Sequence, residues 1–227
     1  KYFAGHSLGE YSALVCAGSL TFDDALYLLH ERGKAMQEAV PVGTGSMIAV
    51  LGMKINDIND LINSRNKNEG ICEIANDNAN GQVIISGNKK SVESFQMTLK
   101  EHKIKSIPLK VSAPFHCLLM KPAAKSMEEK INNTEFKDPL FRIISNVTAN
   151  SESKPNTIKR LLIEQIFSTV KWREGLIYMS NGGIKNFVEI GPGKVLTGMV
   201  KRTVKEPNCF SINSITDIKN FINEFKK

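Results

Sequence analysis

The sequence predicts an α/β protein with a mostly parallel sheet and one smaller inserted unit. Short apolar runs alternate with segments of helical periodicity in residues 1–42 and 112–227, which is typical of a parallel sheet covered by helices. Residues 43–111 instead follow the order β-α-β-β-α-β of the ferredoxin-like arrangement. We therefore expect a core formed by residues 1–42 and 112–227, with residues 43–111 inserted as a ferredoxin-like subdomain.

The first segment predicts a short strand followed by two helices. The letters KYFAG are typical of the end of a buried strand. Apolar residues then follow at helical spacing as far as Gly18, which ends the first helix. A second helix is predicted over residues 22–39, because Thr21 and Asp24 have the spacing of a capping box.

Four strands and two helices account for residues 43–111. The predicted strands are SMIAVLGM, GICEIAN, QVIISG and IKSIPLKV, and the predicted helices are INDINDLINS and KKSVESFQMTLKEH. The segment NDNANG is rich in turn-forming residues, so we expect it to connect the second and third of these strands as a turn.

The remainder of the chain alternates helices with strands. Helices are predicted for CLLMKPAAKSMEEKI, TIKRLLIEQIF, WREGLIYMSN, KVLTGMVKRT and the tail, and strands for LFRIISNV, IKNFVEIG and NCFSIN. One feature is unusual: the first strand of the chain leads directly into a serine motif, whereas other sheet strands usually precede the nucleophile strand of an α/β enzyme. We therefore expect a fragment that lacks N-terminal strands of the sheet.

Composition excludes several classes of protein. The chain has 227 residues, 41% of them hydrophobic, which suffices for a substantial core. No apolar run reaches the roughly 18 residues of a membrane span, and no signal peptide is visible. The four cysteines are scattered with no C-x-x-C pair, which argues against zinc and against a disulfide framework. We expect a cytoplasmic protein without a metal.

The chain is basic, with a net charge of +7 and a pI of about 9.2. A Lys-rich, solvated surface explains this charge, and so does a surface that attracts polyanions. The basic residues do not cluster with aromatic ones, which argues against nucleic acid as a partner. A phosphate-bearing ligand and an acidic protein partner both stay open.

The letters GHSLG, from Gly5 to Gly9, carry the strongest chemical signal. Small residues on both sides allow a sharp turn from strand to helix, which exposes the hydroxyl of Ser7 at the helix N-terminus. There the Leu8 N–H can stabilise developing negative charge. The pattern alone also fits a glycine-rich turn, but its position between strand and helix favours a nucleophile.

A serine nucleophile needs a base, and His116 is the best of four histidines. His6 lies inside the motif, His30 lies in a helix, and His102 lies in a charged segment. His116 follows a strand in the apolar letters VSAPFHC, where a structural capping residue is the alternative. No acidic third member is obvious, and the 111 residues after His116 do not fit the α/β-hydrolase order, so a backbone carbonyl is the alternative orienting group.

Two polar residues lie on apolar helix faces. Arg32 shares the stripe of Leu28 and Leu29, where guanidinium groups are rarely found unpaired. It either extends to the surface, pairs with a core carboxylate, or binds a substrate carboxylate through its two-pronged donor set. Gln165 lies on the face of Leu161 in the same way, as a core glutamine or as part of a site.

Together, these motifs resemble a known family over essentially the whole chain. The segments are GHSLGEYSAL, ERGKAMQEA, GTGSMIAVLG, GQVIISG, VSAPFHCLLMKPA, IEQIFSTVKW and EIGPGKVLTGMVKR. They are similar to the malonyl-CoA:acyl-carrier-protein transacylases of bacterial fatty-acid synthesis. The resemblance implies an α/β-hydrolase-like core with a ferredoxin-like subdomain, and an active site between them.

The resemblance also implies roles. Ser7 would carry the malonyl group, His116 would be the base and Arg32 would bind the malonyl carboxylate. Gln165 would orient His116 through its main-chain carbonyl, and Leu8 would supply one oxyanion N–H. Asn76 and Asn78 match a family segment that lines the cleft.

The implied substrates are malonyl-CoA and acyl carrier protein, with no cofactor, nucleic acid or membrane, and with the chain as a monomer. The family's G-Q-G-x-Q loop, which supplies a second oxyanion N–H, is absent from this sequence. Two alternatives therefore stay open. One is a serine thioesterase or other acyl hydrolase, although a patatin-like enzyme is disfavoured because no D-G dipeptide occurs. The other is an inactive fragment of the transacylase.

Overall fold

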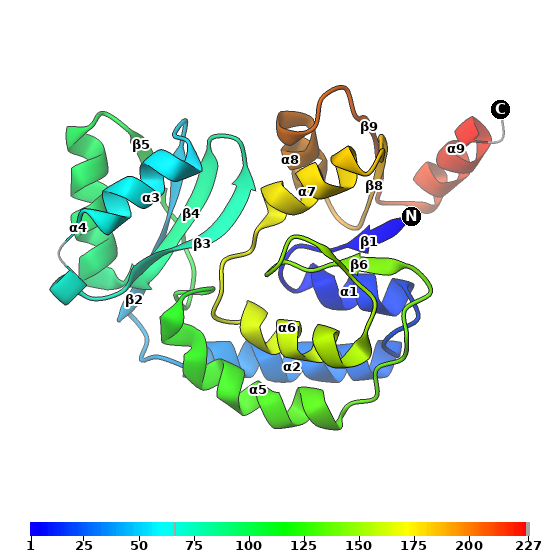
Figure 1. Cartoon of the computed structure of the whole chain (residues 1–227), viewed down its shortest axis with the longest axis horizontal. Helices are drawn as coiled ribbons and strands as arrows, with labels where there is room; N and C mark the ends of the chain where they lie inside the picture. The colour runs from blue at the N-terminus through cyan, green and yellow to red at the C-terminus, as the bar shows by residue number, and fades with distance from the viewer. Residues whose placement is uncertain (66, 226–227) are drawn as a thin grey trace. The chain divides into compact units, whose positions relative to one another are not determined.

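The computed structural model describes residues 1–65 and 67–225, and it confirms the α/β class (Figure 1). The chain divides into two compact units, Lys1–Gly175 and Leu176–Lys227. The boundaries predicted from the sequence, at 42/43 and 111/112, lie just outside a four-stranded sheet inside the first unit. The assignment of residues 1–42 and 112–227 to one core stays a prediction.

The first unit contains a small sheet with the order β1-β6-β7. Strands β1 and β6 are parallel, whereas β6 and β7 are antiparallel. Figure 1 shows α2, α5 and α6 on one side of these strands, with α1 next to β1. The elements are β1 (Tyr2–Ala4), α1 (Gly9–Cys16), α2 (Phe22–Glu38), η2 (Leu118–Met120), α5 (Lys121–Asn133), β6 (Arg142–Ile144), β7 (Ser151–Glu152) and α6 (Pro155–Gln165).

Two details of this sheet differ from the prediction. All three residues of β1 are half-buried, so KYFAG is not the end of a fully buried strand. The two-residue strand β7 was not predicted, because so short a segment has no periodicity to detect. The core under this sheet is formed by one apolar cluster that includes Tyr11, Leu28 and Met127.

The second sheet of this unit has the order β3-β4-β2-β5, and every neighbouring pair is antiparallel. Side chains alternate between its two faces, as the pleat requires. Ile48 and Val50 of β2 pack with Phe95 against the two helices of this segment, whereas Met47 and Ala49 contact a cluster that includes Phe115. The elements are β2 (Gly45–Leu51), α3 (Ile55–Asn63), η1 (Lys67–Glu69), β3 (Cys72–Ala79), β4 (Gln82–Asn88), α4 (Lys89–Glu101) and β5 (Lys105–Pro108).

The predicted turn NDNANG is mostly strand. Strand β3 continues to Ala79, so only Asn80 and Gly81 connect it to β4. The residues that favour turns in isolation are held extended here by a second partner: the Asp77 N–H donates to the Val170 carbonyl at 2.9 Å, and the Val170 N–H donates to the Ala75 carbonyl at 2.8 Å. Tertiary pairing thus overrides the local turn preference.

A buried ion pair reinforces this junction. Asp77, which is almost completely buried, accepts from Arg173 Nε at 2.9 Å and lies 2.8 Å from Arg173 Nη2. Burial raises the pKa of Asp77, while the hydrogen bonds from Arg173 oppose this shift. The pair joins β3 to α7 (Trp172–Asn181), which follows the Val170 segment.

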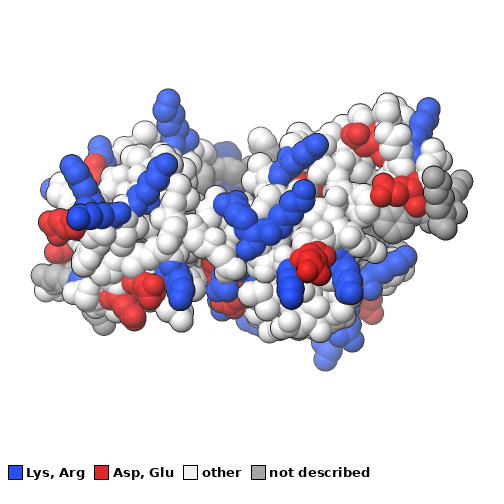
Figure 2. Space-filling view, turned by 90° about the horizontal axis from the view of Figure 1, so that it is seen from above, with Lys and Arg blue, Asp and Glu red and all other residues white. Residues whose placement is uncertain are grey.

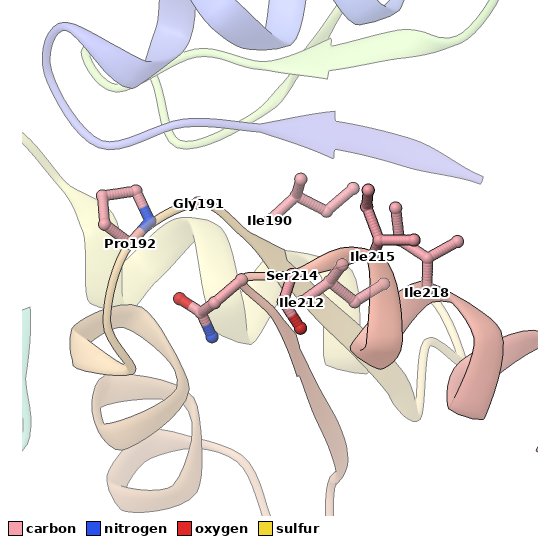
Figure 3. Close-up of a pocket in the computed structure, with 8 residues that line it drawn as sticks. Ile190, Gly191, Pro192, Ile212, Ser214, Ile215 and Ile218 are labelled. Atoms are coloured by element: carbon pink, nitrogen blue, oxygen red, sulfur yellow. The ribbon is translucent and has the colours of Figure 1, made fainter.

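The second unit contains the parallel pair β8 (Asn186–Ile190) and β9 (Asn208–Ile212) with α8 (Val195–Thr203) and α9 (Ile215–Phe225). At the start of α8, the N–H groups of Leu196 and Thr197 donate to the carboxylate of Glu189, so GPGK is a helix-entry turn. An apolar pocket of about 470 Å³ lies in this unit. Figure 3 shows Ile190, Ile215 and Ile218 among the residues that line it.

Among residues 1–65 and 67–225, no helix combines the length and the hydropathy that crossing a membrane would require.

The close approach of Gly5 to Gly9 generates the first prediction. A Cβ atom at Gly5 would lie 1.8 Å from the backbone oxygen of Gly9, whereas a Cβ at Gly9 would meet no atom within 4 Å. We expect Gly5→Ala to lower the free energy of unfolding by about 3 kcal/mol or more, because the backbone at Gly9 would have to move to make room for the added methyl group. Gly9→Ala, the matched control, should change it by about 1 kcal/mol or less. Urea denaturation measures both, and equal effects would contradict the prediction.

Candidate active site

Ser7 occupies a sharp turn between β1 and α1. Its φ is +52°, a left-handed conformation that is rare for a residue with a side chain and is typical of strained functional turns. Asn146 holds this turn from both ends: its Oδ1 accepts from the Ser7 N–H at 2.7 Å, and its Nδ2 donates to the Gly5 carbonyl at 2.8 Å. The serine hydroxyl is thereby fixed at the N-terminus of a helix, as the motif predicted.

His116 lies 109 positions from Ser7 in sequence and contacts it directly. Ser7 Oγ and His116 Nε2 are 2.8 Å apart, and His116 Nδ1 lies 2.8 Å from the main-chain oxygen of Gln165. A carbonyl oxygen can only accept, so Nδ1 carries the proton in the neutral ring and Nε2 is free to accept the serine proton. This is the arrangement that a serine nucleophile and its base require.

The imidazole of His116 is neutral at physiological pH. Burial lowers its pKa to about 3, and the positive charge of Arg32 contributes in the same direction. The bond to the Gln165 carbonyl opposes this shift but is the smaller effect. His116 therefore rests in the state that can accept a proton.

Arg32 projects from α2 into the same site and is 6% exposed. Its Nη2 donates to Ser7 Oγ and to Gln165 Oε1, both at 2.9 Å. Among residues 1–65 and 67–225, its Nε has no partner. Arg32 thus points inward from the apolar face of α2 to the Ser7 hydroxyl. Its burial excludes the alternative in which this side chain extends to the surface.

Gln165 is completely buried at the end of α6. Its main-chain oxygen holds His116, while its side-chain Nε2 donates to the Ser7 carbonyl at 3.0 Å and to Glu10 Oε2 at 2.7 Å. Its Oε1 accepts from Arg32. One residue thus contacts the nucleophile, the base and the cation.

The other predicted site residues are placed differently. The Leu8 side chain is exposed, and its N–H has no acceptor within the described part of the chain, so it is free to donate to an oxyanion. Asn78 Oδ1 lies 2.8 Å from His6 Nε2, so it reaches the serine turn through His6. Asn76 forms a β-bridge with Val170, and within residues 1–65 and 67–225 no hydrogen bond joins its side chain to Ser7 or His116.

Sequence reasoning missed Glu10 and Asn146. Glu10 is buried, and burial raises its pKa to about 7, although its bond with Gln165 opposes the shift. A signal existed for Glu10, because it precedes Ala13 and Leu14 by three and four residues and so shares their buried helix face. Asn146 lies inside the predicted strand LFRIISNV, where no pattern marks it as a functional residue.

A cleft of about 450 Å³ opens onto His116. Its lining includes Glu73 and Ile74 of β3 together with Leu118, Phe167 and Lys171. Within the described residues, no group of His, Cys, Asp and Glu side chains has the arrangement of a metal site. A hydroxyl, an acceptor nitrogen and a cation thus converge beside a cleft, which suits acyl transfer through a serine ester.

The pKa of His116 generates a prediction about stability. A base with a pKa of about 3 when folded and 6.5 when unfolded stabilises the fold above pH 6.5, and this stabilisation is lost as the pH falls toward 3. Wild type should therefore lose about 1.4 kcal/mol per pH unit relative to His116→Gln between these values. Glu10 acts with the opposite sign between pH 4.5 and 7, but it is present in both proteins. Parallel stability curves from urea denaturation would contradict the prediction.

Comparison with known proteins identifies the family of the chain. Residues 1–226 match the family described as the acyl transferase domain. The malonyl CoA-acyl carrier protein transacylase of Bacillus subtilis is 41% identical over 227 residues, covering 100% of this chain and 72% of that protein.

Solved structures give the same result. An acyl carrier protein S-malonyltransferase from Vibrio cholerae superposes with a TM-score of 0.93 at 41% identity, covering 97% of this chain and 72% of the other. A malonyl-transacylase in complex with a type II PKS acyl-carrier protein matches with a TM-score of 0.93 at 39% identity, with the same coverage. The chain belongs to the acyl transferase domain family, the family of these malonyl CoA-acyl carrier protein transacylases.

Proposed function

We propose that this chain transfers a malonyl group from malonyl-CoA to the phosphopantetheine thiol of acyl carrier protein, through a malonyl ester on Ser7. The observation that carries the proposal is the position of Arg32, whose Nη2 lies 2.9 Å from Ser7 Oγ. An acyl group on that oxygen places its far end beside a buried cation. A free carboxylate there would be paired, and an acetyl group would leave the charge unpaired.

The first half-reaction follows from the hydrogen bonds. His116 Nε2 takes the proton of Ser7 as the Oγ attacks the thioester carbonyl, and the free Leu8 N–H donates to the oxyanion that forms. The protonated imidazole is stabilised by the Gln165 carbonyl. The C–S bond then breaks, and His116 returns its proton to the departing CoA sulfur.

The second half-reaction reverses these steps with another thiol. His116 takes the proton of the carrier-protein thiol, whose sulfur attacks the ester carbonyl, and Ser7 leaves with the proton that His116 returns. This is a ping-pong sequence that needs no cofactor. The basic charge of the chain suits an acidic partner, and Figure 2 shows more Lys and Arg than Asp and Glu side chains on the surface in view.

The finer architecture belongs to the same proposal. The sheet order β3-β4-β2-β5 and its two helices support a ferredoxin-like subdomain over residues 43–111. The parallel pairs β1-β6 and β8-β9 support the α/β-hydrolase-like core. Asn76 and Asn78 would line the cleft from β3. The monomeric state and the cytoplasmic location stay predictions.

Hydrolysis of the malonyl ester is the alternative outcome, with water in place of the carrier thiol. The half-reaction test separates these possibilities: mixed with malonyl-CoA, wild type should gain one malonyl group on Ser7, seen by intact-protein mass spectrometry, and Ser7→Ala should gain none. Added carrier protein should then remove the label and become malonylated. Release of free malonate instead would identify a hydrolase, and no labelling of wild type would identify an inactive fragment.

Selectivity for the carboxylate is a separate prediction. Arg32→Ala should lower the rate of malonyl loading about 10–100-fold more than that of acetyl loading, since a hydrogen bond to a charged group contributes about 1.5–3 kcal/mol. Rapid-quench mass spectrometry with the two acyl-CoA substrates measures both rates. Arg160→Ala, an exposed arginine of α6, is the matched control and should change neither. Equal losses for both substrates would refute the role of Arg32.

A further inference from the structure

We propose that Glu10 is a positioning residue for malonyl selectivity: its carboxylate fixes the side-chain amide of Gln165, which in turn aims Arg32 at the acyl group on Ser7. The selectivity in this statement rests on the proposed malonyl transfer. The positioning itself rests on contacts among Glu10, Gln165 and Arg32.

Glu10 lies in the first turn of α1 yet does not act as an ordinary surface residue of a helix N-terminus. It is 3% exposed, and its Oε2 accepts from Gln165 Nε2 at 2.7 Å and from the Asn146 N–H at 3.3 Å. Both partners are more than 130 positions away in sequence. A buried carboxylate with two such donors is a tertiary contact of the site.

The carboxylate selects one of the two orientations of the Gln165 amide. In the observed orientation, Nε2 faces two acceptors, Glu10 Oε2 and the Ser7 carbonyl, and Oε1 faces the donor Arg32. A rotated amide would place Oε1 against both acceptors and its NH₂ group against the guanidinium. Above its pKa of about 7, Glu10 is ionised and can only accept, so it then disfavours the rotated form of the amide.

The amide orientation determines what Arg32 can do. Its Nη2 is held between Gln165 Oε1 and Ser7 Oγ, and its Nε has no partner among the described residues. The negative charge of Glu10 also attracts the buried guanidinium of Arg32. Loss of the Glu10 charge would leave both the amide and the guanidinium free to reorient.

Kinetics with two substrates tests this role. Glu10→Gln keeps the size of the side chain and removes its charge, so malonyl loading of Ser7 should fall about 10-fold or more while acetyl loading changes about 3-fold or less. Glu38→Gln, an exposed glutamate at the end of α2, is the matched control and should change neither rate. A purely structural role would lower both rates together, and that result, or no change in either, would overturn the proposal.

A second readout needs no turnover. In ¹⁵N NMR spectra, a guanidinium held at Nη2 rotates slowly, so we expect resolved Nη signals for Arg32, assigned with Arg32→Lys. These signals should merge in Glu10→Gln and also in Glu10→Asp, which keeps the charge but withdraws it by one methylene. If wild type loads no malonyl group but these signals merge, the proposed function fails and the positioning role stands. Unchanged signals in both variants would refute the positioning role whatever the activity.

Discussion

The site depends on one buried residue at the end of a helix, Gln165. The last carbonyl groups of an α-helix have no partner inside the helix, so the carbonyl of Gln165 is available for His116 Nδ1 at 2.8 Å. Helix termination thus supplies the acceptor that an Asp or Glu provides in other serine enzymes. Because the same residue also contacts Ser7 and Arg32 through its side chain, the position of α6 sets the geometry of nucleophile, base and cation together.

Electrostatics explains why the acceptor is a carbonyl here. Burial and the charge of Arg32 both lower the pKa of His116, so the resting imidazole is neutral and its Nε2 can accept. A carboxylate at Nδ1 would raise that pKa and would also compete for the guanidinium that must bind the substrate. Glu10 supplies the negative charge at a distance, with Gln165 between it and Arg32. The site therefore has a balancing charge without a triad acid.

The local parts of this site could be predicted from the residues themselves, whereas the contact between His116 and the Gln165 carbonyl was implied only by the family resemblance. Ser7 is marked by its flanking glycines, and Arg32 and Gln165 are polar residues on otherwise apolar helix faces, which is a periodic signal. The contacts that give Glu10 and Asn146 their role join groups more than 130 positions apart, so the sequence showed at most the buried helix face of Glu10. The segment NDNANG was wrongly predicted as a turn for the same reason, since its extended form depends on Val170.

The four-stranded sheet has a larger role than covering the cleft. One of its faces packs against Phe115, the residue before His116, and its edge strand β3 pairs with Val170, five residues after Gln165. His116 and Gln165 are therefore both joined to this sheet by short chain segments. The Asp77–Arg173 ion pair also holds the segment that contains Val170 against the sheet. A shift of the sheet would change the distance between His116 Nδ1 and the Gln165 carbonyl only if the two ties moved unequally. Because both ties reach the same sheet, that one element positions the imidazole of His116 and the carbonyl that orients it.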